Sequence, residues 1–162
     1  FAEAASHGEV VVNATAGAVS LEALERAGEE NLSGKVLMDI SNPLDFSKGM
    51  PPTLSVVNTD SLGEQIQRRF PEAKVVKTLH TMNARLMFDP ARLAGGDHTV
   101  FVSGDAPEAK AAVADLLRSF GWRDIVDLGD ITTARGTEMM LPVWVRLFGA
   151  LEKPLFNFKI VR

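Results

Sequence analysis

The sequence predicts an α/β fold: a Rossmann-like parallel sheet with flanking helices. Three short, β-branched runs each end in small or polar residues, and helix-forming segments separate them. These runs and their endings are Val10–Val12 with Asn13–Gly17, Val36–Ile40 with Ser41–Pro43, and Lys74–Leu79 with His80–Asn83. The order of strands and helices favours right-handed crossovers and a parallel sheet. Because open α/β sheets bind ligands at the carboxyl ends of their strands, we expect the three endings to line one crevice.

The helices between these strands follow from local signals. Leu21–Ala27 is amphipathic, and Ser20 is its expected N-cap. Gly28 stands where a helix would end. A second helix is expected to start at Asp60 or Ser61 and to run to Phe70.

The connection from Leu44 to Thr59 is the least regular stretch. Its prolines and glycine exclude a long helix. Connections of this length are uncommon in compact domains unless they are functional, so we expect a functional loop.

The second half of the chain contains further α/β elements. Strands are expected at His98–Ser103 and Asp124–Leu128, with a helix from Glu108 to Phe120 between them. Met139–Leu151 is apolar around its circumference except at Arg146, which predicts a buried helix or a homodimer interface. Phe156–Val161 alternates like a terminal strand.

The composition excludes several classes of function. The chain has 162 residues, enough for one domain with a core. The net charge of -4 argues against a nucleic-acid surface, which requires a basic footprint. No apolar run approaches the roughly 18 residues that a membrane helix requires. Cysteine is absent, which excludes thiolate metal sites and cysteine nucleophiles and favours a cytoplasmic protein. The three histidines lack metal-ligand spacing, so no metal site is expected.

The chain starts at Phe1 with residues typical of the end of a helix, and a strand follows at once. We therefore expect that an amino-terminal part of the fold lies outside this sequence. Neither a G-x-G-x-x-G motif nor a Walker loop occurs. In a Rossmann fold the first βα unit carries the G-x-G-x-x-G motif, so its absence here fits that expectation.

A few polar side chains are candidates for chemistry. His80 could donate a hydrogen bond or a proton to a ligand, or it could be a packed imidazole satisfied by a backbone group. Arg135 and Glu138 lie on one helix face, where they could close the cleft or form an ordinary salt bridge with each other. Met82 could line an apolar slot or fill the core. We expect His98 to be structural or at the surface, and His7 to be solvated.

Several segments together resemble one enzyme family. They are Val12–Thr15, Asp39–Leu44, Lys77–Ala84, Gly104-Asp105 and Asp127–Gly129. In order, and over nearly the whole chain, they are similar to the NADPH-dependent reductases of the deazaflavin coenzyme F-420, also called F-420:NADP oxidoreductases. The Leu-His-Thr-Met-Asn-Ala segment, residues 79–84, is the most specific part of the match.

The resemblance implies hydride transfer between NADP(H) and coenzyme F-420 as small-molecule partners. It implies that residues 1–87 are the carboxy-terminal portion of the dinucleotide-binding domain, and that residues 88–162 are a smaller α/β extension closing the deazaflavin side. Thr15 and Ala16 would contact the nicotinamide half of the cofactor.

The resemblance also places residues around the meeting point of the two rings. His80 and Met82 would serve catalysis, His80 by stabilising charge on the deazaflavin. The remaining cofactor-binding candidates are Ser41, Asn42, Pro43, Thr81, Asn83, Ala84, Arg135 and Leu141. Two alternatives stay open: a reductase of another acceptor, such as a flavin, ferric iron or an imine, and a non-catalytic dinucleotide-binding module.

Overall fold

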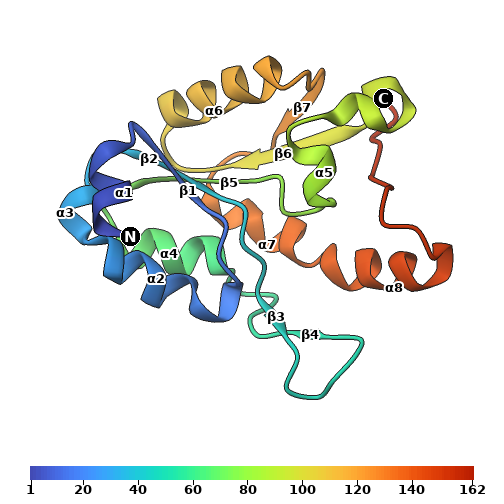
Figure 1. Ribbon diagram of the computed structural model, residues 1–162, viewed down its shortest axis with the longest axis horizontal. Helices are drawn as coiled ribbons and strands as arrows, with labels where there is room; N and C mark the ends of the chain where they lie inside the picture. Colours follow the sequence, from blue (N-terminus) through green and yellow to red (C-terminus); the bar gives the residue numbers. More distant parts are fainter.

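The computed structural model describes residues 1–162, and its main feature is a five-stranded sheet (Figure 1). The strands are β1 (Val10–Asn13), β2 (Val36–Asp39), β5 (Lys74–Thr78), β6 (Thr99–Ser103) and β7 (Asp124–Asp127), and they lie in the order β1-β2-β5-β6-β7. β1, β2 and β5 are parallel. The prediction that the first three strands end at one edge of the sheet is confirmed.

The second half of the sheet runs the opposite way, which corrects the expectation of a wholly parallel sheet. β6 pairs antiparallel with β5, and β7 is parallel to β6. The connection from β5 to β6 holds only α5 (Ala84–Met87) and two single turns, η2 (Pro90–Arg92) and η3 (Ala94–Gly96). Because no helix there is long enough to cross the sheet, β6 starts at the edge where β5 ends.

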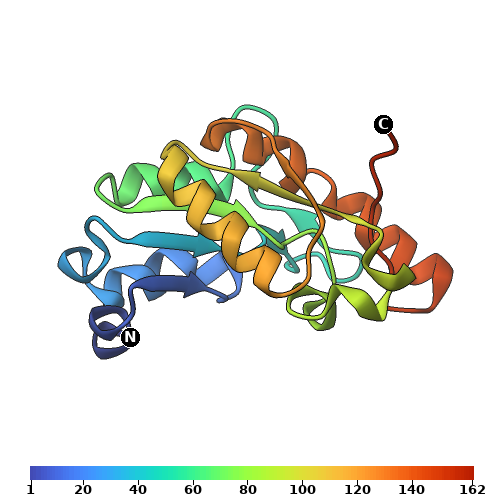
Figure 2. The same cartoon turned by 90° about the horizontal axis from the view of Figure 1, so that it is seen from above.

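Helices cover both faces of the sheet. α1 (Ala2–His7), α2 (Ser20–Ala27), α3 (Glu29–Leu32) and α4 (Leu62–Arg69) come from the first half of the chain. Figure 1 shows α2 and α4 on one face and α6 (Pro107–Ser119) on the other, and Figure 2 shows α6 lying across the strands. The predicted boundary at residue 87 falls at the end of α5, between two strands that pair with each other.

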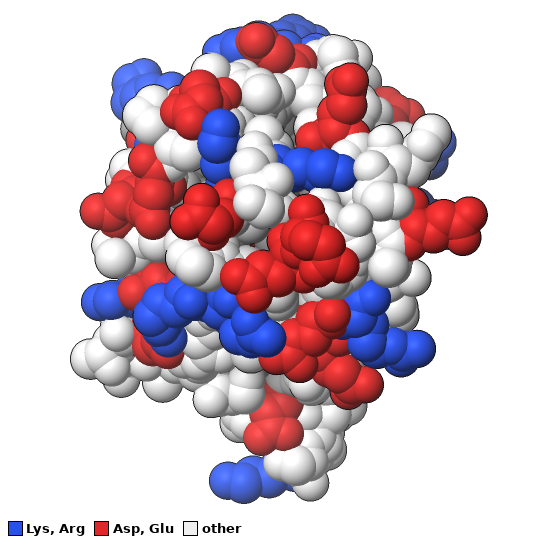
Figure 3. Space-filling view, turned by 90° about the vertical axis from the view of Figure 1, so that its left-hand side faces the viewer, with Lys and Arg blue, Asp and Glu red and all other residues white.

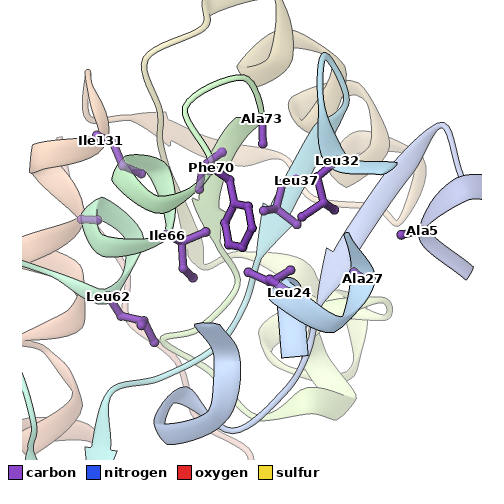
Figure 4. Packing of buried hydrophobic residues seen from close by; sticks show 12 residues of the cluster. Ala5, Leu24, Ala27, Leu32, Leu37, Leu62, Ile66, Phe70, Ala73 and Ile131 are labelled. Carbon is purple, nitrogen blue, oxygen red and sulfur yellow. The ribbon is translucent and has the colours of Figure 1, made fainter. Parts of the chain in front are cut away.

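Two apolar clusters form the core, one on each face. Leu37 points toward α2 and α4, where it packs with Leu24, Ile66 and Phe70 (Figure 4). Val75 belongs to the same cluster. The residues that follow in each strand, Met38 and Val76, join Val113, Leu117 and Trp122 beneath α6. Successive side chains of a strand point to opposite faces, so these runs are apolar without alternation because both faces are covered.

The outer edge of β1 has no strand beside it. Val10 and Val12 on this strand remain 39% and 48% exposed. A shallow groove lined mainly by apolar residues of α1, β1 and α2 runs along the same edge.

The predicted helix caps are partly confirmed. Ser61 Oγ accepts a hydrogen bond from the N–H of Glu64 at the start of α4, and Gly28, with φ of 89°, ends α2. The prediction that Ser20 caps α2 is wrong. Ser20 is the first residue within the helix, and its buried hydroxyl contacts Asn13 and Thr15 instead.

Two segments differ from their predicted form. The connection after β2 contains a small hairpin, β3 (Leu44–Asp45) and β4 (Thr53–Leu54), which protrudes from the body in Figure 1. Phe156–Val161 forms no strand, because the hydroxyl of Thr99 rather than its carbonyl accepts from the N–H of Ile160.

The apolar helix expected over Met139–Leu151 forms as one continuous helix from Leu141 to Leu151. A single turn, η4 (Ile131–Thr133), leads into α7 (Ala134–Glu138), and α8 (Leu141–Leu151) follows after a break. Leu141 is the buried residue of α8, while Val143, Phe148 and Leu151 are between 41% and 53% exposed. No helix in the structure has both the length and the hydropathy to cross a membrane.

Candidate functional site

A row of polar side chains crosses the ends of the three parallel strands. Asn13, Asp39 and Lys77 are lateral neighbours in the strand register. Asn13 Nδ2 donates to Asp39 Oδ1 at 2.8 Å, and Lys77 Nζ donates to Asp39 Oδ2 at 2.7 Å. The side chains of Asp39 and Lys77 have no exposed surface. Charged groups this deeply buried are stable only when paired and hydrogen-bonded.

This row fixes the two loops that follow β1 and β2. Asp39 Oδ1 accepts from both the N–H and the hydroxyl of Ser41, at 3.1 and 2.7 Å. Lys77 Nζ donates to the Ser41 carbonyl at 2.7 Å. In the other loop, the hydroxyl of Thr15 donates to Asn13 Oδ1 at 2.7 Å. Thr15 is partly buried, and Ala16 beside it is exposed.

The two loops also touch each other. A Cβ added at Gly17 would lie 2.0 Å from the carbonyl oxygen of Asn42, so only glycine permits this approach. Pro43 is buried just beyond the contact. The predicted cofactor-binding segments at Thr15–Ala16 and Ser41–Pro43 are therefore brought together at one edge of the sheet.

Helix α7 reaches the same edge through Glu138. Its Oε1 lies 3.0 Å from Lys77 Nζ, and its carboxylate accepts from the N–H groups of Leu62 and Gly63 at 2.8 and 3.0 Å. These two donors belong to the first turn of α4, where a negative charge is favoured. Burial disfavours the Lys77 ammonium, but Asp39 and Glu138 outweigh that effect and raise the pKa of Lys77 above its ordinary value.

Arg135 and Glu138 do not pair with each other, which corrects one of the two interpretations above. Arg135 makes a two-pronged ion pair with Glu64, at 2.8 and 2.6 Å. That guanidinium lowers the pKa of the Glu64 carboxyl below its ordinary value. Glu138 points inward to the sheet instead, so the two side chains bind different partners on α4 and β5.

His80 lies at a sharp turn beneath these loops. Leu79 adopts a left-handed conformation with φ of 60°, and the N–H of His80 donates to the Thr78 carbonyl at 2.7 Å. The imidazole is 2% exposed, and neither ring nitrogen has a hydrogen-bond partner. Burial, with Lys77 nearby, lowers the pKa of His80 well below its ordinary value, so the ring is neutral at pH 7.

Asn42 shares this environment. Its Nδ2 donates to the His80 carbonyl at 3.1 Å, while its buried Oδ1 has no partner. Buried polar atoms without partners are uncommon in folded proteins and call for an explanation such as a ligand or a water molecule.

The remaining predicted site residues differ in how far they are buried. Thr81 and Met82 are buried, and Met82 belongs to the core cluster beneath α6. Asn83 caps α5 by accepting from the N–H of Arg85 at 3.0 Å, and Ala84 is exposed. Leu141 is buried at the start of α8.

Two grooves flank the protruding hairpin. One, of about 500 Å³, lies between the hairpin and the first turns of α2 and α4, and Gly17, Leu44 and Leu62 are among its lining residues. The other, of about 370 Å³, lies between the hairpin and α8, with Pro52 and Arg146 in its walls. Neither groove reaches the ring of His80.

The buried ion cluster of Asp39, Lys77 and Glu138 was not predicted from the sequence, although the sequence contains a signal for it. Asp39 and Lys77 are the charged residues within otherwise apolar strand runs, Val-Leu-Met-Asp-Ile and Val-Val-Lys-Thr. A charge in a strand buried on both faces requires a partner, and adjacent parallel strands could have been expected to provide it.

The other two histidines match their expected roles. His98 is buried, with Nε2 2.9 Å from the Pro90 carbonyl and its ring edge-on to Trp122, and His7 is exposed. On the face that carries α1 and α3, basic and acidic residues are interspersed (Figure 3).

No protein-family profile matches the chain. A crystal structure from Arthrobacter sp. FB24, provisionally named as an F420-dependent NADP reductase, is 70% identical in sequence. It superposes with a TM-score of 0.99 over all of this chain and 74% of that one. The chain belongs to the F420-dependent NADP reductase family. The resemblance inferred from the Leu-His-Thr-Met-Asn-Ala segment is thereby confirmed.

Two curated proteins are more distant relatives of this F420-dependent NADP reductase homologue. The F420-dependent NADP reductase of Methanocaldococcus jannaschii is 28% identical over 146 residues, which cover 90% of this chain and 64% of that protein. Metalloreductase STEAP3 of Rattus norvegicus is 29% identical over 119 residues, 71% of this chain and 22% of the relative. The chain thus spans less than two thirds of the length of each.

Proposed function

We propose that this chain is part of an oxidoreductase that transfers a hydride between NADP(H) and the deazaflavin coenzyme F-420. The observation that carries the proposal is the 70% identity over the whole chain to a structure bearing that name. The three loops at one sheet edge give such a reaction a place, because open α/β sheets bind their ligands there.

The residues of this chain fit the ring end of the dinucleotide. Thr15 and Ala16 present a small, partly exposed surface beside Ser41 and Asn42, which a flat ring could approach. The phosphate groups would need a glycine-rich turn and basic side chains, and the sequence contains no G-x-G-x-x-G motif. We therefore assign contacts with the nicotinamide to this chain, and assign none of its residues to the phosphates.

The cofactors supply the chemistry of hydride transfer when bound, and the protein supplies alignment and exclusion of water. We assign nicotinamide contact to Thr15 and Ala16. We assign contacts at the border between the nicotinamide and deazaflavin rings to Ser41, Asn42, Pro43, Thr81, Asn83 and Ala84. We assign closure of the deazaflavin side to Leu141 and Arg135, since α8, which starts at Leu141, borders the groove on the far side of the hairpin, and α7 precedes it.

We assign His80 and Met82 to catalysis as part of the same proposal. His80 is neutral and has a free N–H, so it can donate a hydrogen bond where charge develops on the deazaflavin. Protein covers both ring nitrogens, so this contact requires the covering residues to move. Met82 contributes apolar surface beneath the same turn.

A reductase of another acceptor is the second candidate. The observation that favours it is the 29% identity to a metalloreductase, a relative whose name points to a metal acceptor. A non-catalytic dinucleotide-binding module would keep the loops but transfer no hydride.

We also propose that the enzyme is a cytoplasmic homodimer. Absence of cysteine fits a reducing compartment. The exposed apolar side chains of α8 and of the hairpin, among them Val143, Phe148, Phe46 and Met50, are the proposed interface. Light scattering at micromolar concentration tests the dimer, and a monomer there would refute it.

The test of function is a visible-absorbance assay on the complete gene product with NADPH and oxidised coenzyme F-420. We expect NADPH to bleach the deazaflavin and NADH to do so weakly. If ferric iron, a flavin or an imine is reduced and coenzyme F-420 is not, the second candidate is correct. If NADPH binds but no acceptor is reduced, the chain is a binding module. Unchanged turnover and Michaelis constants in His80→Ala would refute the role of His80.

A further inference from the structure

One ammonium group joins three parts of the molecule that are distant in sequence. Lys77 Nζ, on β5, contacts the Asp39 carboxylate at 2.7 Å, the Ser41 carbonyl at 2.7 Å and the Glu138 carboxylate at 3.0 Å. Asp39 holds the loops after β1 and β2, and Glu138 ends α7. The side chains of all three charged residues are at most 2% exposed.

Geometry and charge both give this cluster a fixed arrangement. The Lys77 ammonium has three donors, and each has an acceptor within 3.0 Å. The two carboxylates exceed the single ammonium by one negative charge, and the N–H groups of Leu62 and Gly63 offset that excess at the start of α4. Few other arrangements would satisfy all of these buried groups, so movement of one part must disturb the others.

We propose that Lys77 is the positioning residue that holds the nicotinamide-side loops and helix α7 in a fixed relation. This inference rests on the proposed function, because the loops and α7 are there assigned to the two cofactors. Lys77 is sealed from solvent and is not proposed to touch either cofactor. It acts through Asp39 and Ser41 on one side and through Glu138 on the other.

Glu138→Gln is the most informative variant. It removes the ionic tie between Lys77 and α7 and leaves the Lys77–Asp39 pair, so the remaining buried charges balance. Lys77→Met would instead leave two buried carboxylates, a change that can prevent folding. In single-turnover experiments on the complete gene product, we expect Glu138→Gln to slow hydride transfer by about tenfold or more, since small misplacements of reacting groups have large effects on rate. The dissociation constant of NADPH should change by less than about threefold, because Asp39 still holds the loops assigned to the nicotinamide side.

Lys110→Met is the matched control. Lys110 also joins a carboxylate and a backbone carbonyl, Asp127 Oδ1 and Gly129 O, both at 2.9 Å, but at the outermost strand β7, which β6 separates from β5. We expect this variant to leave the rate of hydride transfer unchanged. A loss of rate in Lys110→Met equal to that in Glu138→Gln would mean that the effect is general destabilisation, and would overturn the proposal.

Amide hydrogen exchange of the cofactor-free protein supplies a readout that does not need activity. We expect faster exchange in α7 of Glu138→Gln, with Ser41 still protected through Asp39, and neither change in Lys110→Met. Unchanged exchange in α7, or an unchanged hydride-transfer rate, would overturn the positioning role. An NADPH affinity that falls as much as the rate would assign Glu138 to nicotinamide binding and overturn the positioning role too. If the unsubstituted protein reduces no coenzyme F-420, the proposed function fails, while the exchange result still reports on the link through Lys77.

Discussion

Acidification should destabilise this protein through His80, and the structure gives the sign of the effect. In the unfolded chain the imidazole titrates near its ordinary pKa of 6.5, whereas in the folded protein its pKa is lowered. As pH falls below 6.5, the His80 imidazole becomes protonated in the unfolded chain but stays neutral in the folded protein. The stability due to the neutral ring is therefore complete above pH 6.5 and is lost progressively down to the folded pKa.

The size of the effect follows from the surroundings of the ring. Both nitrogens are buried without partners, and the nearby charge, the Lys77 ammonium, repels an imidazolium. Within the window below pH 6.5 the free energy of unfolding should fall by about 1.4 kcal/mol per pH unit from this group alone.

Urea denaturation of the wild type and of His80→Leu between pH 8 and pH 5 measures this contribution. Other groups titrate equally in both proteins, so the difference between the two slopes isolates His80. Below pH 6.5, the free energy of unfolding of His80→Leu should fall less steeply with decreasing pH than that of the wild type, by about 1.4 kcal/mol per pH unit. Parallel curves would refute the reasoning, because they would show that the protonated ring finds an acceptor, such as the carbonyl of Thr78 or Thr137.

Four further variants can be measured by urea unfolding. Gly17→Ala should cost about 1–3 kcal/mol, because the new Cβ would meet the backbone of the facing loop, whereas Gly136→Ala, in an exposed turn of α7 with open space around it, should stabilise by roughly 0.5–1 kcal/mol. Trp122→Phe should cost about 1–3 kcal/mol, since the buried Trp122 donates its Nε1–H to the partly buried Met87 carbonyl at 2.9 Å. Asp60→Asn should cost less than about 1 kcal/mol, because its partner Arg68 is exposed. The pKa of Asp60 is lowered to about 2, so that last difference should be present above pH 4 and vanish as pH falls toward 2.

Local patterns predicted the elements of the fold well. Val-Val-Val and Val-Leu-Met-Asp are strands because they are short, β-branched and apolar on both faces. Ser61 caps α4 because its hydroxyl accepts a hydrogen bond from the N–H of Glu64, three residues further along the chain. The convergence of the three loops followed from the parallel order of the strands.

Partners distant in the sequence could not be predicted in the same way. Arg135 and Glu138 are neighbours on one helix face, yet Arg135 pairs with Glu64 from 71 residues away, and Glu138 turns to the sheet. The direction of β6 likewise depends on the length of the segment that follows β5 and not on the strand itself. A strand pattern states which residues are buried but carries no information on the direction of the chain.

The reversal between β5 and β6 has a consequence for how the two halves of the chain are joined. β6 runs back along β5, and its last residue, Ser103, pairs with Lys77, so the central row of polar residues meets the second half of the sheet directly. The same half supplies Glu138, on α7, as a partner of Lys77. A shift of one residue in α7 would rotate Glu138 away from Lys77, while the strands and their core would stay as they are. Sequence change in this short helical segment can therefore alter the link between the two halves without altering the sheet.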